Sequence, residues 1–233
     1  MVNFYVVGGY VRDLLLGRQS KDIDFAVEAS SYEEMNEAIR ARGGRIYLER
    51  EEFLTTRARM FWGVEGREVD ADFVLCRKDG YYSDGRRPDK VELGSLRDDL
   101  ARRDFTVNAI AVTEGGLYID PFEGRRDLED MELRAVGVAA DRFREDSLRL
   151  LRAARFAVTH SFVLHWHIED ALDNLELLAL LKNVSPERIK DELMKMFRAD
   201  TMSAMHMLMD HRNLTEHIFQ DSPVWLRPTM EHP

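Results

Sequence analysis

The sequence has a single cysteine, Cys76, so an internal disulfide bond and a cysteine-rich zinc site are both excluded. It also lacks an apolar run long enough to cross a bilayer, and its N-terminus lacks the basic and apolar regions of a signal peptide. Histidine is sparse, and we interpret the closest pair, His165 and His167, as surface residues at a helix start rather than metal ligands. These absences predict a cytoplasmic protein with no membrane partner.

Positive charge is also in deficit, with 33 Lys and Arg against 43 Asp and Glu and a net charge of −10. This balance argues against a protein that coats nucleic acid by bulk electrostatics, so any RNA contact has to be local. Most of the cations are arginine, whose planar fork suits phosphates and base edges. The composition, 45% hydrophobic and 33% charged, is that of a globular protein with one large core or two modest ones.

The stretch 6–27 has the pattern of a strand, a glycine turn, a helix and a second strand. An apolar run ends at Gly8 and Gly9, and apolar residues then recur at helical spacing as far as Gly17. Backbone amides at such a turn point at anything negatively charged, and Arg12 adds a forked cation to the same place. This segment therefore predicts a phosphate-binding turn.

Two acids occupy alternate positions in the second of these strands. Residues alternate between the faces of a strand, so Asp22 and Asp24 are expected on one side and Ile23 and Phe25 on the core side. Two adjacent carboxylates favour a divalent cation with oxygen ligands, typically magnesium that holds a nucleoside triphosphate. A D-x-D pattern can also be the solvent face of a sheet, and Gly-Gly can be only a turn, so the specificity lies in their combination.

A third acid is expected from the strand over 68–75, where Asp70 and Asp72 share one face. If this strand lies beside the one that carries Asp22 and Asp24, one more carboxylate completes a metal site. We choose Asp72 over Asp70 for this role.

The remaining patterns divide the chain into a mixed α and β region over 1–138 and a helical region over 139–233. The predicted fold class is α+β, with a mixed sheet and flanking helices followed by an all-helical part. Helices are expected over 31–42, 96–100, 105–111, 146–158, 168–181, 185–197 and 202–209, strands over 45–49 and 54–60, a hairpin over 114–119, a polar loop over 78–88 and an extended tail over 223–233. Core filling is expected of Met194, Met196, Met202, Met205, Met207 and Met209.

Four charged residues, Asp146, Arg149, Arg152 and Arg155, recur at steps of three and predict an inclined ridge on one helix. Such a ridge can be only a solvated, salt-bridged face. A neighbouring carboxylate and guanidinium, however, match the amine and ring-nitrogen acceptor on the pairing edges of cytosine and adenine, whereas uracil and guanine present the reverse order. A pair formed by Asp146 and Arg149 could therefore accept C and A without a template.

Five segments follow one another along the chain: GGYVRD with DID at 22–24, LARRDFTVNAIA at 100–111, DPFEGRRDLED at 120–130, FREDSLRLLRAARFA at 143–157 and SPERIKDEL at 185–193. In this order they resemble the tRNA nucleotidyltransferase and bacterial poly(A) polymerase family, specifically the CCA-adding enzymes of its class II branch. The resemblance implies a polymerase-β-like nucleotidyltransferase head joined to a helical neck and a short body that bind RNA and the nucleobase. Members of the family usually continue into longer body and tail helices, and this sequence ends soon after the last segment.

The resemblance also implies roles for individual residues. Two magnesium ions would be held by Asp22, Asp24 and Asp72, the last of which stands where the family usually has glutamate. The incoming nucleotide would meet Gly8, Gly9, Arg12, Arg103, Asn108, Asp146, Arg149, Arg152 and Arg155. The implied reaction is an in-line attack by the 3′-hydroxyl of tRNA or another RNA on the α-phosphate of CTP or ATP, with pyrophosphate as the leaving group.

Other functions stay open at this point. One is an A-only enzyme, either a poly(A) polymerase or an A-adding enzyme, and the retained 78–88 loop mildly favours CCA addition over a CC-only product. Another is a nucleotide- or RNA-binding relative without catalysis, which the intact acids disfavour. The last is nucleotide transfer to a protein hydroxyl, for which no base-reading pair is needed. The sequence leaves the oligomeric state undetermined.

Overall fold

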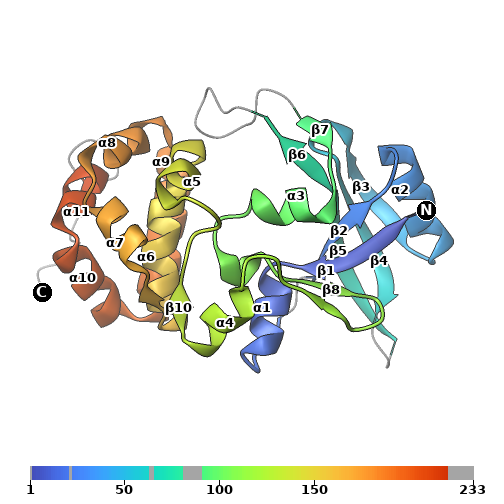
Figure 1. Ribbon diagram of the computed structural model, residues 1–233, viewed down its shortest axis with the longest axis horizontal. Coiled ribbons are helices and arrows are strands. Elements are labelled where there is room, and N and C mark those ends of the chain that lie inside the picture. The colour runs from blue at the N-terminus through green and yellow to red at the C-terminus, as the bar shows by residue number, and fades with distance from the viewer. Residues whose placement is uncertain (1, 21–22, 63–65, 81–90, 220–233) are drawn as a thin grey trace, which may run out of the picture. The chain divides into compact units, whose positions relative to one another are not determined.

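The computed structural model describes residues 2–20, 23–62, 66–80 and 91–219 (Figure 1). The chain folds into two compact units, and the main boundary between them falls between Asp130 and Met131. The sequence analysis divided the chain between residues 138 and 139 and assigned the RNA- and base-binding part to 139–233, and this functional boundary stays a prediction. Among the described helices, none has both the length and the apolar character needed to cross a membrane.

The first unit is built on a seven-stranded sheet in the order β3-β4-β5-β2-β1-β8-β9. Its β2 and β5 pair in parallel, and its other described pairings are antiparallel, so the sheet is mixed as the sequence predicted. The strands are β1 (Asn3–Val7), β2 (Ile23–Glu28), β3 (Arg45–Arg50), β4 (Thr55–Trp62), β5 (Arg67–Leu75), β8 (Ala111–Thr113) and β9 (Tyr118–Ile119).

One face of this sheet forms an aromatic core. Phe25 on β2 stacks on Phe73 on β5 with ring centroids 4.8 Å apart. Helix α2 (Tyr32–Ala41) covers this face, since its Asn36 accepts a hydrogen bond from Thr56, the cross-strand partner of Phe73. The helix predicted over 31–42 starts after a capping residue, because the Ser31 hydroxyl accepts from the Glu34 amide at 3.1 Å. The side chains of Asp24 and Asp72 point to the opposite face of the sheet.

The shorter elements of this unit surround the sheet. They are α1 (Gly9–Leu15), α3 (Leu96–Ala101), α4 (Gly124–Glu129), the 3₁₀ turns η1 (Glu51–Phe53) and η2 (Thr106–Asn108), and the paired strands β6 (Arg77–Asp79) and β7 (Val91–Leu93). The predicted loop at 78–88 therefore begins with strand residues, and 81–88 lies outside the described residues.

The helix predicted over 105–111 is wrong, because the 3₁₀ turn η2 forms there and Ala111 already belongs to β8. Phe105, Val107, Ala109 and Ile110 are all fully buried, so the segment has no solvent face that an amphipathic helix would need. Gly124 packs against its backbone, where an added Cβ would lie 2.1 Å from the Thr106 carbonyl oxygen. Tertiary packing therefore overrides the helical spacing.

The second unit is helical apart from a short parallel pair, β10 (Glu132–Leu133) and β11 (Val163–Leu164). Its helices are α5 (Ala139–Glu145), α6 (Leu148–His160), α7 (Trp166–Leu172), α8 (Leu175–Leu178), the 3₁₀ turn η3 (Ala179–Asn183), α9 (Pro186–Ala199), α10 (Thr201–Asp210) and α11 (Arg212–Phe219). The single helix predicted over 168–181 is divided, because the Asn174 side chain accepts from the Glu176 and Leu177 amides and starts a new helix. The tail predicted over 223–233 lies outside the described residues.

The methionines are not core filler as a group. Met196 is buried, but Met194, Met202, Met205 and Met209 are 40%, 64%, 45% and 69% exposed. The reason lies in α10, where Ala204 and Leu208, four residues apart, form the buried face. The two histidines at the start of α7 are placed as expected, with His165 capping the helix by accepting from the His167 amide.

Candidate active site

Asp24 and Asp72 lie side by side in the sheet of the first unit. Strands β2 and β5 pair in parallel with Asp24 opposite Asp72, so both side chains leave the same face. Asp22 lies outside the described residues, and its role stays a prediction. The parallel pairing meets the condition under which a third acid was expected next to the D-x-D pair.

Arginines of β4 hold the acids of β5. The Arg57 guanidinium binds both carboxylate oxygens of Asp72, with Nε 2.7 Å from Oδ1 and Nη2 3.0 Å from Oδ2. Arg59 holds Asp70 in the same way, and its hydrogen bonds lower the pKa of that carboxyl. Of the two candidate acids, Asp70 and Asp72, Asp72 is the one in register with Asp24.

The glycine turn lies against these acids. Gly8 has φ 74°, in the region that favours glycine, and a Cβ built on it would lie 3.0 Å from Nη1 of Arg103 and 3.5 Å from Oδ2 of Asp24. The turn therefore needs glycine both for its backbone angle and for the space beside two functional side chains. Gly9 follows at the start of α1, where an added Cβ would lie 3.4 Å from Nη2 of Arg12.

Arg12 is buried and bound to a residue far along the chain. Its Nη1 donates to Oδ1 of Asn108 at 2.8 Å, and its Nε donates to Asp13. Asn108 in turn donates its side-chain amide to Asp104 at 3.0 Å. The fold thus brings GGYVRD and RRDFTVN together, as a shared nucleotide site would require.

Arg103 is oriented by a buried acid that the sequence analysis missed. Asp99 on α3 is fully buried, and its Oδ2 accepts from Nη2 of Arg103 at 3.0 Å while Oδ1 accepts from Arg102. Burial acts to raise the pKa of Asp99, but the charges and hydrogen bonds of Arg103 and Arg102 outweigh it and hold that pKa below its usual range. The remaining Nη1 of Arg103 is directed at the Asn108 carbonyl, 3.3 Å away. The sequence signal was the four-residue spacing of Asp99 and Arg103, although α3 ends at Ala101 and Arg103 follows its C-cap.

In the second unit, Asp146 lies before the helix and not on it. The predicted helix over 146–158 begins instead at Leu148, whose amide donates to Oδ1 of Asp146 at 3.1 Å. An Asp that caps local amides competes with the helical backbone, which explains the shift. Oδ2 of Asp146 accepts from Arg188 on α9 at 2.9 Å, a partner that the sequence analysis missed. The predicted ridge of four residues on one helix is therefore reduced to three.

The three arginines of α6 are partly buried and do not form a solvated face. Nη1 of Arg149 donates to Glu145 at 2.8 Å and to the Arg142 carbonyl at 3.0 Å. Arg155 forms an ion pair with Glu192 of α9, and Arg152 lies over the Phe156 ring at 5.7 Å. The side chains of Arg149 and Arg155 are each only 13% exposed.

The first unit, a mixed sheet that carries paired carboxylates beside a glycine turn and buried arginines, defines a polymerase-β-like nucleotidyltransferase head, and a helical unit follows it. The chain belongs to the poly(A) polymerase head-domain family, because the model of the Poly A polymerase head domain matches residues 4–134, more than half of the chain. A second model, described as the probable RNA and SrmB-binding site of polymerase A, matches residues 174–225.

Curated relatives named CCA-adding enzyme include those of Streptococcus uberis, 42% identical over 84% of this chain, and Listeria innocua, 39% identical over 85%. The chain spans 45% and 47% of their lengths, about half.

Two solved structures share the fold over most of the chain. One is a tRNA nucleotidyltransferase with a primer tRNA and an incoming ATP analog, at TM-score 0.75 and 32% identity over 94% of this chain and 60% of that one. The other is the Bacillus stearothermophilus CCA-adding enzyme with CTP, at TM-score 0.73 and 34% identity over 89% of this chain and 47% of that one.

Nucleotidyltransferases of this family use a divalent metal. The donor chemistry of this chain fits such a metal, since Asp24 and Asp72 offer hard carboxylate oxygens from one register of the sheet. No three His, Cys, Asp or Glu side chains form a metal cluster among the residues that the structure describes, a set that leaves out Asp22. Arg57 uses one lone-pair position on each oxygen of Asp72, which leaves a second position on each oxygen for a metal.

Proposed function

We propose that this chain is a template-independent RNA 3′-terminal nucleotidyltransferase, which adds C and A to tRNA from CTP and ATP with release of pyrophosphate in the cytoplasm. The observation that carries the proposal is the match at 42% identity to a CCA-adding enzyme over 84% of the chain. The proximity of Gly8, Asp24 and Arg103 supports the proposal, because it places a phosphate-sized turn next to an acid and a cation.

We assign two magnesium ions to Asp22 and Asp24, with Asp72 as a third ligand that keeps its hydrogen bonds to Arg57. When bound, one ion lowers the pKa of the RNA 3′-hydroxyl and the other neutralises the leaving pyrophosphate. Arg103 donates to the triphosphate, and Asp99 keeps its fork in place. Arg12 and Asn108 act as one hydrogen-bonded unit at the sugar and phosphates, beside Gly9.

Base selection is assigned to Asp146 and Arg149. A carboxylate has about four lone-pair positions, and the hydrogen bonds of Asp146 to Leu148 and Arg188 use one on each oxygen. An exocyclic amine can therefore still bind to Asp146, while Arg149 donates to the neighbouring ring nitrogen. Arg152 and Arg155 are assigned to phosphates. Arg155 is already paired with Glu192, so a phosphate there competes with that carboxylate.

An experiment with separately labelled nucleotides tests this function. Purified protein, magnesium and tRNA that ends at the discriminator base are incubated with each labelled NTP in turn. We expect CTP to be incorporated alone and ATP only after CTP, and we expect Asp24→Ala to abolish both.

The second candidate is an A-only enzyme, which the poly(A) polymerase names of both matching models favour. Incorporation of ATP without any need for CTP would establish that function in place of CCA addition. Binding of CTP without turnover would instead indicate a non-catalytic relative.

A further inference from the structure

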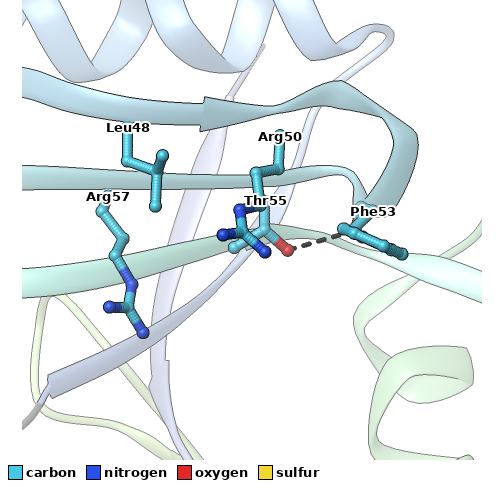
Figure 2. A pocket seen from close by; sticks show the side chains of 5 residues that line it. All are labelled: Leu48, Arg50, Phe53, Thr55 and Arg57. Atoms are coloured by element: carbon cyan, nitrogen blue, oxygen red, sulfur yellow. Dashed lines mark hydrogen bonds between the residues drawn. The ribbon is translucent and has the colours of Figure 1, made fainter.

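A pocket lies on the acid-bearing face of the sheet, at the turn between β3 and β4 (Figure 2). It has a volume of about 320 Å³ and is lined by Leu48, Arg50, Phe53, Thr55 and Arg57. Arg57 is the residue that binds Asp72, so the pocket opens on the same face as Asp24 and Asp72. This volume is at the lower end of the range for small-ligand sites, which begins at about 300 Å³.

The pocket has a fixed backbone. The Tyr32 hydroxyl, buried behind it, accepts from the Arg50 amide at 3.1 Å and donates to the Thr55 carbonyl at 2.9 Å. Leu54 adopts φ 55°, a left-handed conformation that is rare for leucine, and its carbonyl accepts from the Leu75 amide at 2.9 Å. Strained backbone residues that the surrounding structure holds in place are concentrated at active sites and ligand-binding sites.

The charge of the pocket comes from Arg50. On β3 and β4, Arg45, Arg57 and Arg59 are each matched by a carboxylate of β5. The Arg50 guanidinium, by contrast, has no carboxylate partner among the residues that the structure describes, and it is exposed. In Figure 2 it lies in front of Thr55, between Arg57 and Phe53. An uncompensated guanidinium in a pocket is suited to a phosphate.

The apolar wall of the pocket suits a nucleobase. The Phe53 side chain is 39% exposed at the end of η1, and Leu48 lines the other side. Exposed aromatic rings can bind single-stranded nucleic acid by stacking on its bases, whatever their sequence. A cation for a phosphate beside a ring for a base fits one nucleotide of a single strand.

The position of the pocket indicates which nucleotide it would bind. Asp24, Asp72 and Arg57 are successive register partners on β2, β5 and β4. Leu48 of β3 is in turn the register partner of Arg57, so about three strand spacings, roughly 14 Å, separate the Cα atoms of Asp24 and Leu48. This separation is too large for the reacting 3′-terminal residue and is suited to a nucleotide slightly upstream of it.

We propose that the pocket formed by Arg50, Phe53 and Leu48 binds the single-stranded RNA just upstream of the 3′-hydroxyl, with its phosphate on Arg50 and its base on Phe53. The inference rests on the proposed function, since it takes the strand whose 3′ end reacts at Asp24. It adds an RNA subsite on the head, separate from the residues assigned to the incoming nucleotide. It also gives a net-negative protein a local means of holding RNA.

The test measures the affinity of the protein for a fluorescently labelled single-stranded RNA by anisotropy, with no nucleotide or metal present. We expect Arg50→Ala to raise the Kd about tenfold and to reduce the slope of log K against log salt by about 0.7, the loss of one phosphate contact. We expect Phe53→Ala to raise the Kd about tenfold without changing that slope. Phe53→Leu, which keeps the apolar volume but loses the ring, should weaken binding as well.

The matched control is Arg40→Ala on α2, which also removes one exposed arginine, but one that is already paired with Glu49. It should leave both the affinity and the salt slope unchanged. Wild-type RNA affinity in Arg50→Ala and Phe53→Leu would overturn the inference. A loss of affinity for free CTP or pyrophosphate in place of RNA would also overturn it, because the pocket would then hold the nucleotide.

The binding assay needs no incorporation, so the two proposals can fail separately. Normal CCA addition by the variants together with unchanged RNA affinity would contradict only the pocket assignment. Weakened RNA binding together with a wild-type protein that extends no RNA would contradict only the proposed function.

Discussion

At the scale of single residues, the candidate site depends on charges that other charges hold in place. Asp99 is fully buried yet ionised, because two arginines surround it, and it is the residue that orients Arg103. Asp72 is likewise matched by Arg57. Alternation predicted the acids and the family resemblance implied Arg103, but neither indicated Asp99 or Arg57, because a pattern shows which face a residue occupies and not which partner it meets there.

We expect Asp99→Asn to lower the free energy of unfolding by about 3 kcal/mol, because it leaves two arginines without their buried partner. Urea unfolding measures this change. The control is Asp130→Asn, whose ion pair with Arg126 is exposed, and it should cost less than about 0.5 kcal/mol. Equal stability of the two variants would show that Asp99 is not a buried ionic centre.

The same pair of variants predicts a dependence on pH. The folded-state pKa of Asp99 is depressed below its ordinary value of 3.8, so its stabilising effect is complete above that pH and is lost as the pH falls through the folded pKa. Wild type should therefore lose stability below pH 3.8 more steeply than Asp99→Asn. Parallel curves in acid unfolding experiments would contradict the assignment.

Gly8 gives a second prediction at this scale, because a methyl group there would meet Arg103 and Asp24. We expect Gly8→Ala to cost about 1–2 kcal/mol of stability from the backbone angle and to reduce nucleotide incorporation about 100-fold by displacing these side chains. Gly17→Ala is the matched control, since Gly17 also has positive φ, but nothing lies within 4 Å of its added Cβ. Equal incorporation by the two variants would remove Gly8 from the site.

At the scale of elements, the strands of the first unit could be predicted more fully than the helices of the second. The strands β1 to β5 were all predicted. Alternation indicated β2 and β5, whose Phe25 and Phe73 are buried on the core face. Helical spacing failed at η2, where every apolar residue is buried on all sides, and at Asn174, where one cap divides a helix. The short helices α4 and α11 were missed for a related reason, since contacts distant in sequence determine such short elements.

The contact between α6 and α9 provides the test at this scale. Arg155 on α6 pairs with Glu192 on α9, whose side chain is only 5% exposed. We expect Arg155→Ala to cost about 3 kcal/mol, because among the described residues the Lys195 contact is then the one ion pair left to this buried carboxylate. Adding Glu192→Gln should restore part of this loss, with a coupling energy of about 1 kcal/mol or more in urea unfolding. Additive effects would show that the pair does not join the two helices and would leave Arg155 available for phosphates.

At the scale of the whole molecule, the two units carry different parts of the proposed reaction. The first carries the acids, the glycine turn and Arg103, and the second carries Asp146 and Arg149. This division of the site residues could be predicted from the sequence, because the five segments occur in the order found in the family. The sequence could not predict the pocket at Arg50 and Phe53, since a turn that has no motif of its own forms this pocket.

The central claim, that this chain adds C and A without a template, is tested most directly by sequencing RNA 3′ ends. A tRNA that ends at its discriminator base is incubated with the protein, magnesium and all four NTPs, and the added nucleotides are then read. We expect most extended ends to read CCA, with U and G rare, and no extension by Asp24→Ala. Tails of A alone, or ends that stay unextended with the wild-type protein, would contradict the account.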